Sequence, residues 1–352
     1  MADRPPIAPL HGLRALAALT VLVGHVLPWA GYPGLHLAPS IGVVLFFVLS
    51  GYLLGRLYLS EKFTFGNVAR YVVARVARVY PLFAVVVVAA ALPSIWLNGR
   101  SPFGVGFDRV LEHLGLAGSG TTIWTIAVEF RFYLLFIPLW LGFSLLTRNR
   151  LLLASAFVLS VVALLWLTGM TGDRLAMNRY LHLFLLGMLG ALVGERATGW
   201  RTAAAAVLPI SLGMYVASFF VVPMLYDQEL VYGDIVVSAG VLLLVLAAVE
   251  APTSTVGRVL SARPLVWLGE VSFGVYLLHR PVMFAFKELG LTALSGAVLV
   301  ATVFGATIAI AAFANIVIEK PARTAIRNLG DAVIGKVGSR LVRVATRDTA
   351  AE

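Results

Sequence analysis

Four ionisable residues lie inside apolar stretches of this chain: Arg14, His25, Glu129 and His279. An ionisable group at the depth of a lipid bilayer costs on the order of several kcal/mol, so it faces the interior of a helix bundle and usually marks a functional site. A neutral imidazole beside a carboxylate is suited to act as a general base near neutral pH. These residue types therefore predict proton-transfer chemistry inside a membrane.

Arg14 and His25 are eleven residues apart in one apolar stretch. In an α-helix this separation is only about 20° from three full turns, so both side chains lie on one face, about 16 Å apart along the axis. The predicted spans place Glu129 and His279 about 10 Å below the outer surface. The sequence thus predicts one outer layer of His25, Glu129 and His279, with Arg14 near the inner entrance. The alternative is a set of buried polar residues that join helices by hydrogen bonds.

A membrane bundle has to position these residues, because the composition excludes a soluble enzyme. The chain of 352 residues is 60% hydrophobic and 12% charged, about half the charged share of a soluble domain. It contains no Cys, which excludes disulfides and a thiol nucleophile. We expect an all-α, polytopic membrane helix bundle of about ten transmembrane helices, because ten apolar runs approach the ~20 residues of a spanning helix: about 9–28, 41–59, 80–97, 122–146, 151–169, 179–194, 203–224, 234–250, 264–286 and 291–318.

The distribution of positive charge predicts the topology. Ten spans put both termini on one side, and 19 of the 27 Lys and Arg residues then fall in inner segments, against six in outer ones. This bias favours cytoplasmic termini. It also explains the net charge of +10, so no nucleic-acid partner is expected. We expect residues 1–325 to form the transmembrane domain and residues 326–352 a basic cytoplasmic tail.

Five short motifs surround the ionisable residues, between about positions 12 and 281. They are Gly12-Leu-Arg14 with Gly24-His25, Gly42-Val-Val-Leu-Phe-Phe-Val-Leu-Ser50-Gly51-Tyr52, Arg75-Val-Ala-Arg78-Val-Tyr80-Pro81, Trp124-Thr-Ile-Ala-Val-Glu129-Phe-Arg-Phe132-Tyr133, and Leu268-Gly269-Glu-Val-Ser272-Phe-Gly-Val-Tyr276-Leu-Leu-His279. In these words and this order the chain resembles the acyltransferase-3 family, the bacterial integral-membrane acyltransferases. We expect the stand-alone form, without a fused extracytoplasmic domain.

The resemblance implies a membrane-bound O-acyltransferase of the bacterial cytoplasmic (inner) membrane. Such an enzyme moves an acyl group, commonly acetyl, from cytoplasmic acyl-CoA to a hydroxyl of an extracytoplasmic glycan or glycolipid. The resemblance implies His25 as the catalytic base, and Arg14, Arg75 and Arg78 as the residues that hold the CoA phosphates. Arg75 and Arg78 point the same way on a helix, and guanidinium groups suit phosphate. We expect Glu129 to orient the His25 ring, acyl-CoA (acetyl-CoA) as co-substrate, and no metal.

Ser272, Tyr276 and His279 share one helical face by steps of four and three residues. We expect them to line the acceptor pocket, and hydrogen bonding between helices is the alternative. Two residues depart from the family's pattern. His11 replaces the usual acidic residue and offers an extra phosphate contact, and Arg280 replaces the usual Trp and would suit an anionic acceptor.

Other classes of protein are compatible with buried ionisable residues. A secondary transporter is the main alternative, because Arg, His and Glu also build proton relays, although the inverted repeat of many transporters is not found in the sequence. A structural or assembly subunit is a third possibility. A metal enzyme is not expected, because ligand spacings such as His-Glu-x-x-His do not occur. An acyl-Ser50 intermediate is an alternative to direct transfer.

Overall fold

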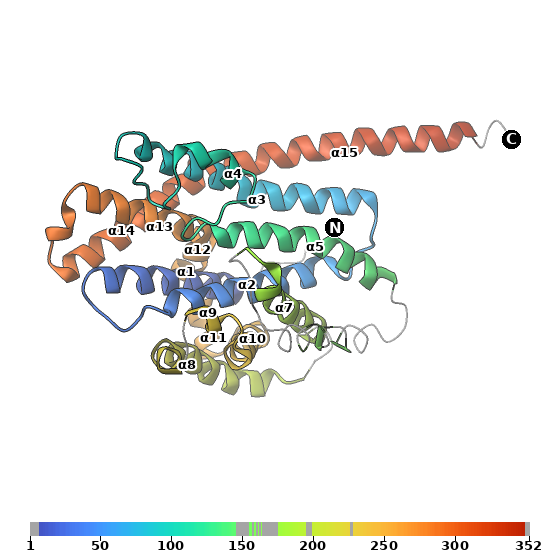
Figure 1. The fold of residues 1–352 in the computed structure, drawn as a ribbon. Helices are drawn as coiled ribbons and strands as arrows, with labels where there is room; N and C mark the ends of the chain where they lie inside the picture. The colour runs from blue at the N-terminus through green and yellow to red at the C-terminus, as the bar shows by residue number, and fades with distance from the viewer. Residues whose placement is uncertain are drawn as a thin grey trace.

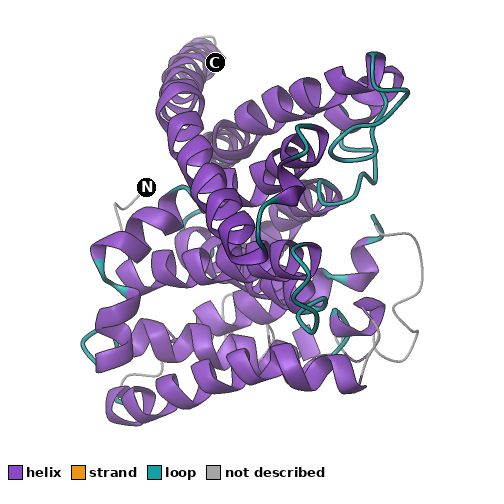
Figure 2. Cartoon of the chain, turned by 90° about the vertical axis from the view of Figure 1, so that its left-hand side faces the viewer, coloured by secondary structure: helices purple, strands orange, loops and turns teal. Residues whose placement is uncertain are grey.

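The structure is a computed structural model that describes residues 7–145, 155–156, 158–159, 161, 163, 175–194, 199–225 and 228–348. The side chains of residues 228–229 and 337–348 are not part of this description. Every regular element in the described residues is a helix, and none of them is in a strand (Figure 2). The predicted all-α class is therefore confirmed for this part of the chain.

The described part of the chain contains both long and short helices. In chain order they are α1 (Ala8–Trp29), α2 (Ala38–Tyr58), α3 (Phe65–Ala91), η1 (Leu92–Ile95), η2 (Phe107–Arg109), α4 (Val110–Leu114), α5 (Trp124–Leu145), η3 (Met177–Arg179), α7 (Leu181–Gly194), α8 (Arg201–Leu225), α9 (Gln228–Val231), α10 (Ile235–Glu250), α11 (Thr255–Leu260), α12 (Arg263–Glu270), α13 (Ser272–Glu288), η4 (Leu291–Ala293), α14 (Gly296–Ala314), the π-helical turn η5 (Asn315–Glu319) and α15 (Lys320–Asp348).

Six of the described helices are long and apolar enough to cross a membrane. They are α1, α2, α3 with η1, α5, α8 and the continuous segment that begins with α14. Two further apolar helices, α7 and α10, are shorter. A multi-pass membrane bundle is therefore supported, whereas the count of ten spans and the side of the termini stay predictions. The predicted span 151–169 lies largely outside the described residues.

Two predicted span boundaries are wrong. The predicted span 264–286 is broken into α12 and α13, since the Ser272 hydroxyl donates to the Gly269 carbonyl at 2.8 Å and competes with regular helix hydrogen bonding there. The predicted span 80–97 starts too late, because its helix, α3, begins at Phe65. The Thr64 hydroxyl accepts a hydrogen bond from the Asn67 N–H and caps the helix.

α1 and α2 lie in the middle of the bundle, with α3, α5 and α15 on one side and α8 and α10 on the other (Figure 1). α1 packs against α2, α12 and α13, while α2 also packs against α7. The α2–α7 contact depends on two glycines. A Cβ on Gly51 would overlap the Phe184 carbonyl, and one on Gly187 would overlap the Val48 carbonyl. The backbones therefore touch directly, as small residues permit in membrane helices.

Candidate active site

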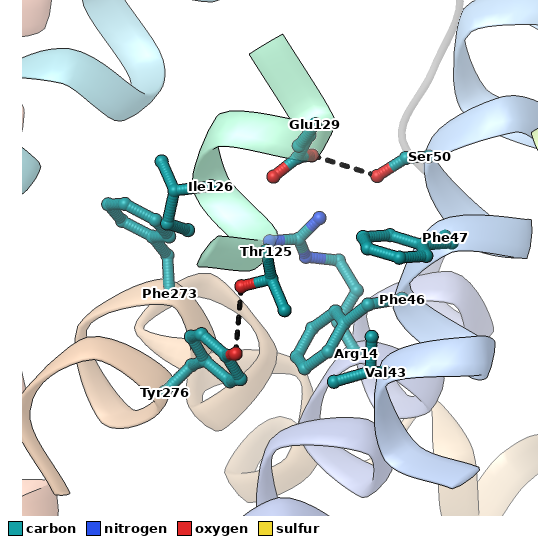
Figure 3. A pocket seen from close by; sticks show the side chains of 10 residues that line it. All are labelled: Arg14, Val43, Phe46, Phe47, Ser50, Thr125, Ile126, Glu129, Phe273 and Tyr276. Carbon is teal, nitrogen blue, oxygen red and sulfur yellow. Dashed lines mark hydrogen bonds between the residues drawn. The ribbon is translucent and has the colours of Figure 1, made fainter. Parts of the chain in front are cut away.

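A small cavity of about 40 Å³ lies among α1, α2, α5 and α13 (Figure 3). Its polar lining consists of Arg14, Ser50, Thr125, Glu129 and Tyr276. Apolar side chains complete the wall, namely Val43, Phe46, Phe47, Ile126 and Phe273. A buried polar patch within an apolar wall is the usual composition of a ligand site.

Glu129 is the hydrogen-bond acceptor on one side of the cavity. Its carboxylate accepts from the Ser50 hydroxyl at 2.9 Å and from the Tyr133 hydroxyl at 2.5 Å. The Arg14 guanidinium points into the same space (Figure 3), where the Glu129 charge attracts it. Arg14 also donates to the Ser272 hydroxyl at 3.3 Å. Glu129 is thus the counter-ion of a buried cation.

Three arginines gather at this side of the bundle. Arg75 lies over the rings of Tyr58 and Tyr133, with 5.8 Å from its guanidinium carbon to each centroid. Arg78 is near enough to Arg14 and Arg75 for their charges to repel. The Nε atoms of Arg14 and Arg75 are buried without a hydrogen-bond partner, as is Nδ1 of His11. Such donors suit an anionic ligand, because they can supply charge-assisted hydrogen bonds to its oxygens.

His25 and His279 form a pair whose ring centroids are 5.0 Å apart. His25 Nδ1 is 2.9 Å from the Val21 carbonyl oxygen, and His279 Nδ1 is 2.5 Å from the Tyr276 carbonyl oxygen. A carbonyl can only accept, so Nδ1 of each ring is the donor and carries the proton. In the neutral ring Nε2 is then the basic nitrogen. The Nε2 atoms of His25 and His279 are thus the ring nitrogens that do not bind the backbone of α1 or α13.

Tyr276 joins the cavity to the histidine pair. Its hydroxyl donates to the Thr122 carbonyl at 2.9 Å and lies 2.8 Å from the Thr125 hydroxyl oxygen. Its ring centroid is 5.9 Å from Phe46 and 5.9 Å from His279. Neither histidine lines the cavity. The Tyr276 and Phe46 rings therefore stand between the arginine side and the histidine side.

Residues 7–316 match the protein family described as an acyltransferase domain. The chain belongs to the acyltransferase-3 family. The resemblance found in the five motifs is thereby confirmed.

Several relatives have named functions. The chain is 26% identical over 316 residues to the peptidoglycan O-acetyltransferase OatA of Listeria monocytogenes, covering 80% of this chain and 50% of that protein. It is 27% identical over 319 residues to the putative peptidoglycan O-acetyltransferase YrhL of Bacillus subtilis, covering 78% and 48%. It is 26% identical over 318 residues to the O-acetyltransferase OatA of Staphylococcus aureus, covering 78% and 50%. The chain thus spans about half the length of these relatives. No solved structure gives a significant match.

This acyltransferase-3 chain does not have the predicted single layer of His25, Glu129 and His279. Gly24 packs against Pro39 of α2, and Ser50, the partner of Glu129, is eleven residues further along α2. At 1.5 Å per residue this places Glu129 about 16 Å from the level of His25. The prediction that Glu129 orients the His25 ring is also wrong, since Val21 holds that ring.

The error in the depth of Glu129 has a physical cause. The prediction assumes that the helix containing Glu129 starts at the outer surface, near residue 122. In the structure Thr122, Ile123 and Trp124 are buried, so α5 begins inside the bundle and Glu129 lies deeper than the sequence suggests.

The residues expected to line an acceptor pocket occupy different levels of the bundle. Ser272 contacts Arg14, Tyr276 lines the cavity, and His279 contacts His25. Sequence reasoning gave no role to Tyr133, although its spacing of four residues from Glu129 puts both on one helical face. Among the described residues, no group of three or more His, Cys, Asp or Glu is placed to hold a metal ion.

Proposed function

We propose that this protein is a membrane O-acyltransferase that moves an acetyl group from cytoplasmic acyl-CoA to a hydroxyl of an extracytoplasmic glycan. The observation that carries the proposal is the buried arginine group, which is joined through Tyr276 to the His25–His279 pair. The family supports acyl transfer. The peptidoglycan O-acetyltransferases among its relatives support acetyl as the acyl group and a glycan as acceptor.

In this proposal Arg14, Arg75 and Arg78 bind the phosphates of the donor. Guanidinium forks bind phosphate oxygens in pairs, and the unpartnered Nε atoms of Arg14 and Arg75 are available for this purpose. The pantetheine arm extends along the face of α1 that Arg14 and His25 share, about 16 Å along the axis. The rings of Phe46 and Tyr276 turn aside as the thioester passes.

His25 then acts as the general base. Its Nε2 takes the proton of the acceptor hydroxyl, while the hydroxyl oxygen attacks the thioester carbonyl. The carbon–sulfur bond breaks, and the leaving CoA sulfur takes the proton that His25 held. His279 packs against the His25 ring and keeps it in place. Ser50 donates its hydrogen bond to Glu129 in this scheme and is not the acyl acceptor.

The experiment that tests the function is a transfer assay with the purified protein. Labelled acetyl-CoA is incubated with a panel of glycans, peptidoglycan fragments included, and products are read by mass spectrometry. We expect an acetylated glycan with the wild-type protein and none with His25→Ala, since the base is lost. His36→Ala, which changes an exposed histidine of the loop before α2, is the control and keeps full activity. Counterflow of a solute without any acyl-CoA would favour a secondary transporter instead.

A further inference from the structure

The junction between α14 and α15 is unusual for a helix that faces lipid. Its five residues, Asn315–Glu319, form a π-helical turn, a feature that often occurs at functional sites. Ile316 and Val317 are exposed on the outside of this turn, whereas Asn315 and Glu319 are 4% and 3% exposed. The turn therefore directs a carboxylate into the bundle, where a charge needs a partner.

α15 runs beside α3 in the opposite direction (Figure 1). Arg70 pairs with Asp331 at 3.7 Å, and Gly330 packs against Val73. Moving five to eight residues from these contacts along both helices brings Arg78 of α3 and Arg323 of α15 to a similar level. Their charges are near enough to repel. The packing of α15 thus adds an arginine to the group on α1 and α3.

Glu319 holds Arg323 at this place. Its Oε2 is 3.5 Å from Nη2 of Arg323, and its charge also attracts Arg78 and Arg14. The second oxygen of Glu319 and the Nε of Arg323 are buried without a hydrogen-bond partner. The side chain of Arg323 is 32% exposed. It can therefore be reached from the surface while one of its donors points inward.

We infer that Arg323 is a fourth arginine of the acyl-CoA phosphate site, positioned by Glu319 from the π-helical turn. The inference rests on the proposed function. Four arginines, Arg14, Arg75, Arg78 and Arg323, surround two carboxylates, Glu129 and Glu319. Counted over these six side chains alone, the group carries a net charge of +2, and a polyphosphate head matches it in sign and in hydrogen-bond geometry.

Two donors distinguish binding of the nucleotide head from a structural role. Acetyl-CoA carries the phosphates, and S-acetylpantetheine carries the same thioester without them. We expect Arg323→Gln to raise KM for acetyl-CoA about tenfold, the order expected when one charge-assisted hydrogen bond is lost. KM for S-acetylpantetheine should not change. Arg323→Lys keeps the charge without the fork and should give a smaller rise.

Arg327→Gln is the matched control, because Arg327 lies one turn further along α15 and is exposed. It should leave KM for both donors unchanged. The inference is overturned if Arg323→Gln leaves KM for acetyl-CoA unchanged, or if it impairs both donors equally. A wild-type protein that uses neither donor overturns the proposed function itself, and the inference with it.

Discussion

Glu129 is the residue whose surroundings define the arginine side of the site. It is acceptor to two hydroxyl groups and counter-ion to Arg14, and Arg75 lies over the ring of its neighbour Tyr133. A carboxylate in this position keeps the arginines together in the absence of an anion. In the proposed function an incoming phosphate competes with this carboxylate for the arginines, so donor binding has to rearrange these contacts.

Replacing Glu129 by Gln should therefore destabilise the folded protein. The change keeps the shape and leaves the buried arginines without their counter-ion, which costs about 3 kcal/mol when one member of a buried charge pair is removed. Thermal unfolding of the detergent-solubilised protein measures this as a lower melting temperature. CoA should restore part of the loss, because its phosphates replace the missing negative charge.

Glu112→Gln is the control for Glu129→Gln. Hydrogen bonds from Arg109 lower the pKa of the Glu112 carboxyl, but the pair is exposed on the loop side of the bundle. An exposed pair contributes little to stability. Equal melting temperatures for Glu129→Gln and Glu112→Gln would show that Glu129 is not a required counter-ion.

At the scale of the helices, direct backbone contacts set the level of each functional residue. Gly12 lies against the Leu260 carbonyl, and Gly269 lies against the His11 carbonyl. This close approach of α1 to the α11–α12 region brings Arg14 within hydrogen-bond distance of Ser272. The glycines of the family motifs thus permit close contact between helices, and this contact positions the polar residues beside them.

Gly51→Ala tests this role of glycine in the α2–α7 contact. The new methyl group would overlap the Phe184 carbonyl, and overpacking of this kind costs about 1–3 kcal/mol. We expect a lower melting temperature and reduced transfer, because Ser50 is the adjacent residue. Gly213→Ala in α8 meets no atom within 4 Å and should be neutral or slightly stabilising. Similar behaviour of the two variants would refute the packing role.

The sequence predicts faces of helices better than it predicts depth. Helical spacing predicts that Arg14 and His25 share one face of α1, and in the structure both contact α13, Arg14 at Ser272 and His25 at His279. Depth requires the true start of a helix, and the buried Thr122–Trp124 segment moves Glu129 to the level of Arg14. Arg323 could not be found from local patterns, because its place depends on the packing of α15 along α3. The sequence alone shows Arg323 only as one of several basic residues that follow the predicted span 291–318.

The described helices form a bundle in which the arginine group and the histidine pair lie at different levels, about 16 Å apart along α1. The arginines lie on the side of the bundle where Arg70 and the α15 helix are found, and the histidines lie beyond Tyr276. The positive-inside bias of the sequence predicts that the arginine side faces the cytoplasm. This orientation would let a soluble donor and an extracytoplasmic acceptor meet within the protein.

The absence of Cys makes the orientation directly measurable. Single cysteines are introduced at Lys62, in the α2–α3 connection, and at Leu111, in the short helix α4 between α3 and α5, both of which are exposed. In intact cells a membrane-impermeant thiol reagent should label Leu111→Cys. It should label Lys62→Cys only after the membrane is opened. The reverse pattern would place the arginine side outside and contradict the proposed direction of transfer.

Transfer across a sealed membrane tests the central claim most directly. The purified protein is reconstituted into sealed vesicles that contain a peptidoglycan fragment, and labelled acetyl-CoA, which does not cross the bilayer, is added outside. We predict acetylated glycan inside the vesicles with the wild-type protein and none with His25→Ala. Product that forms only when donor and acceptor share one compartment would contradict the account.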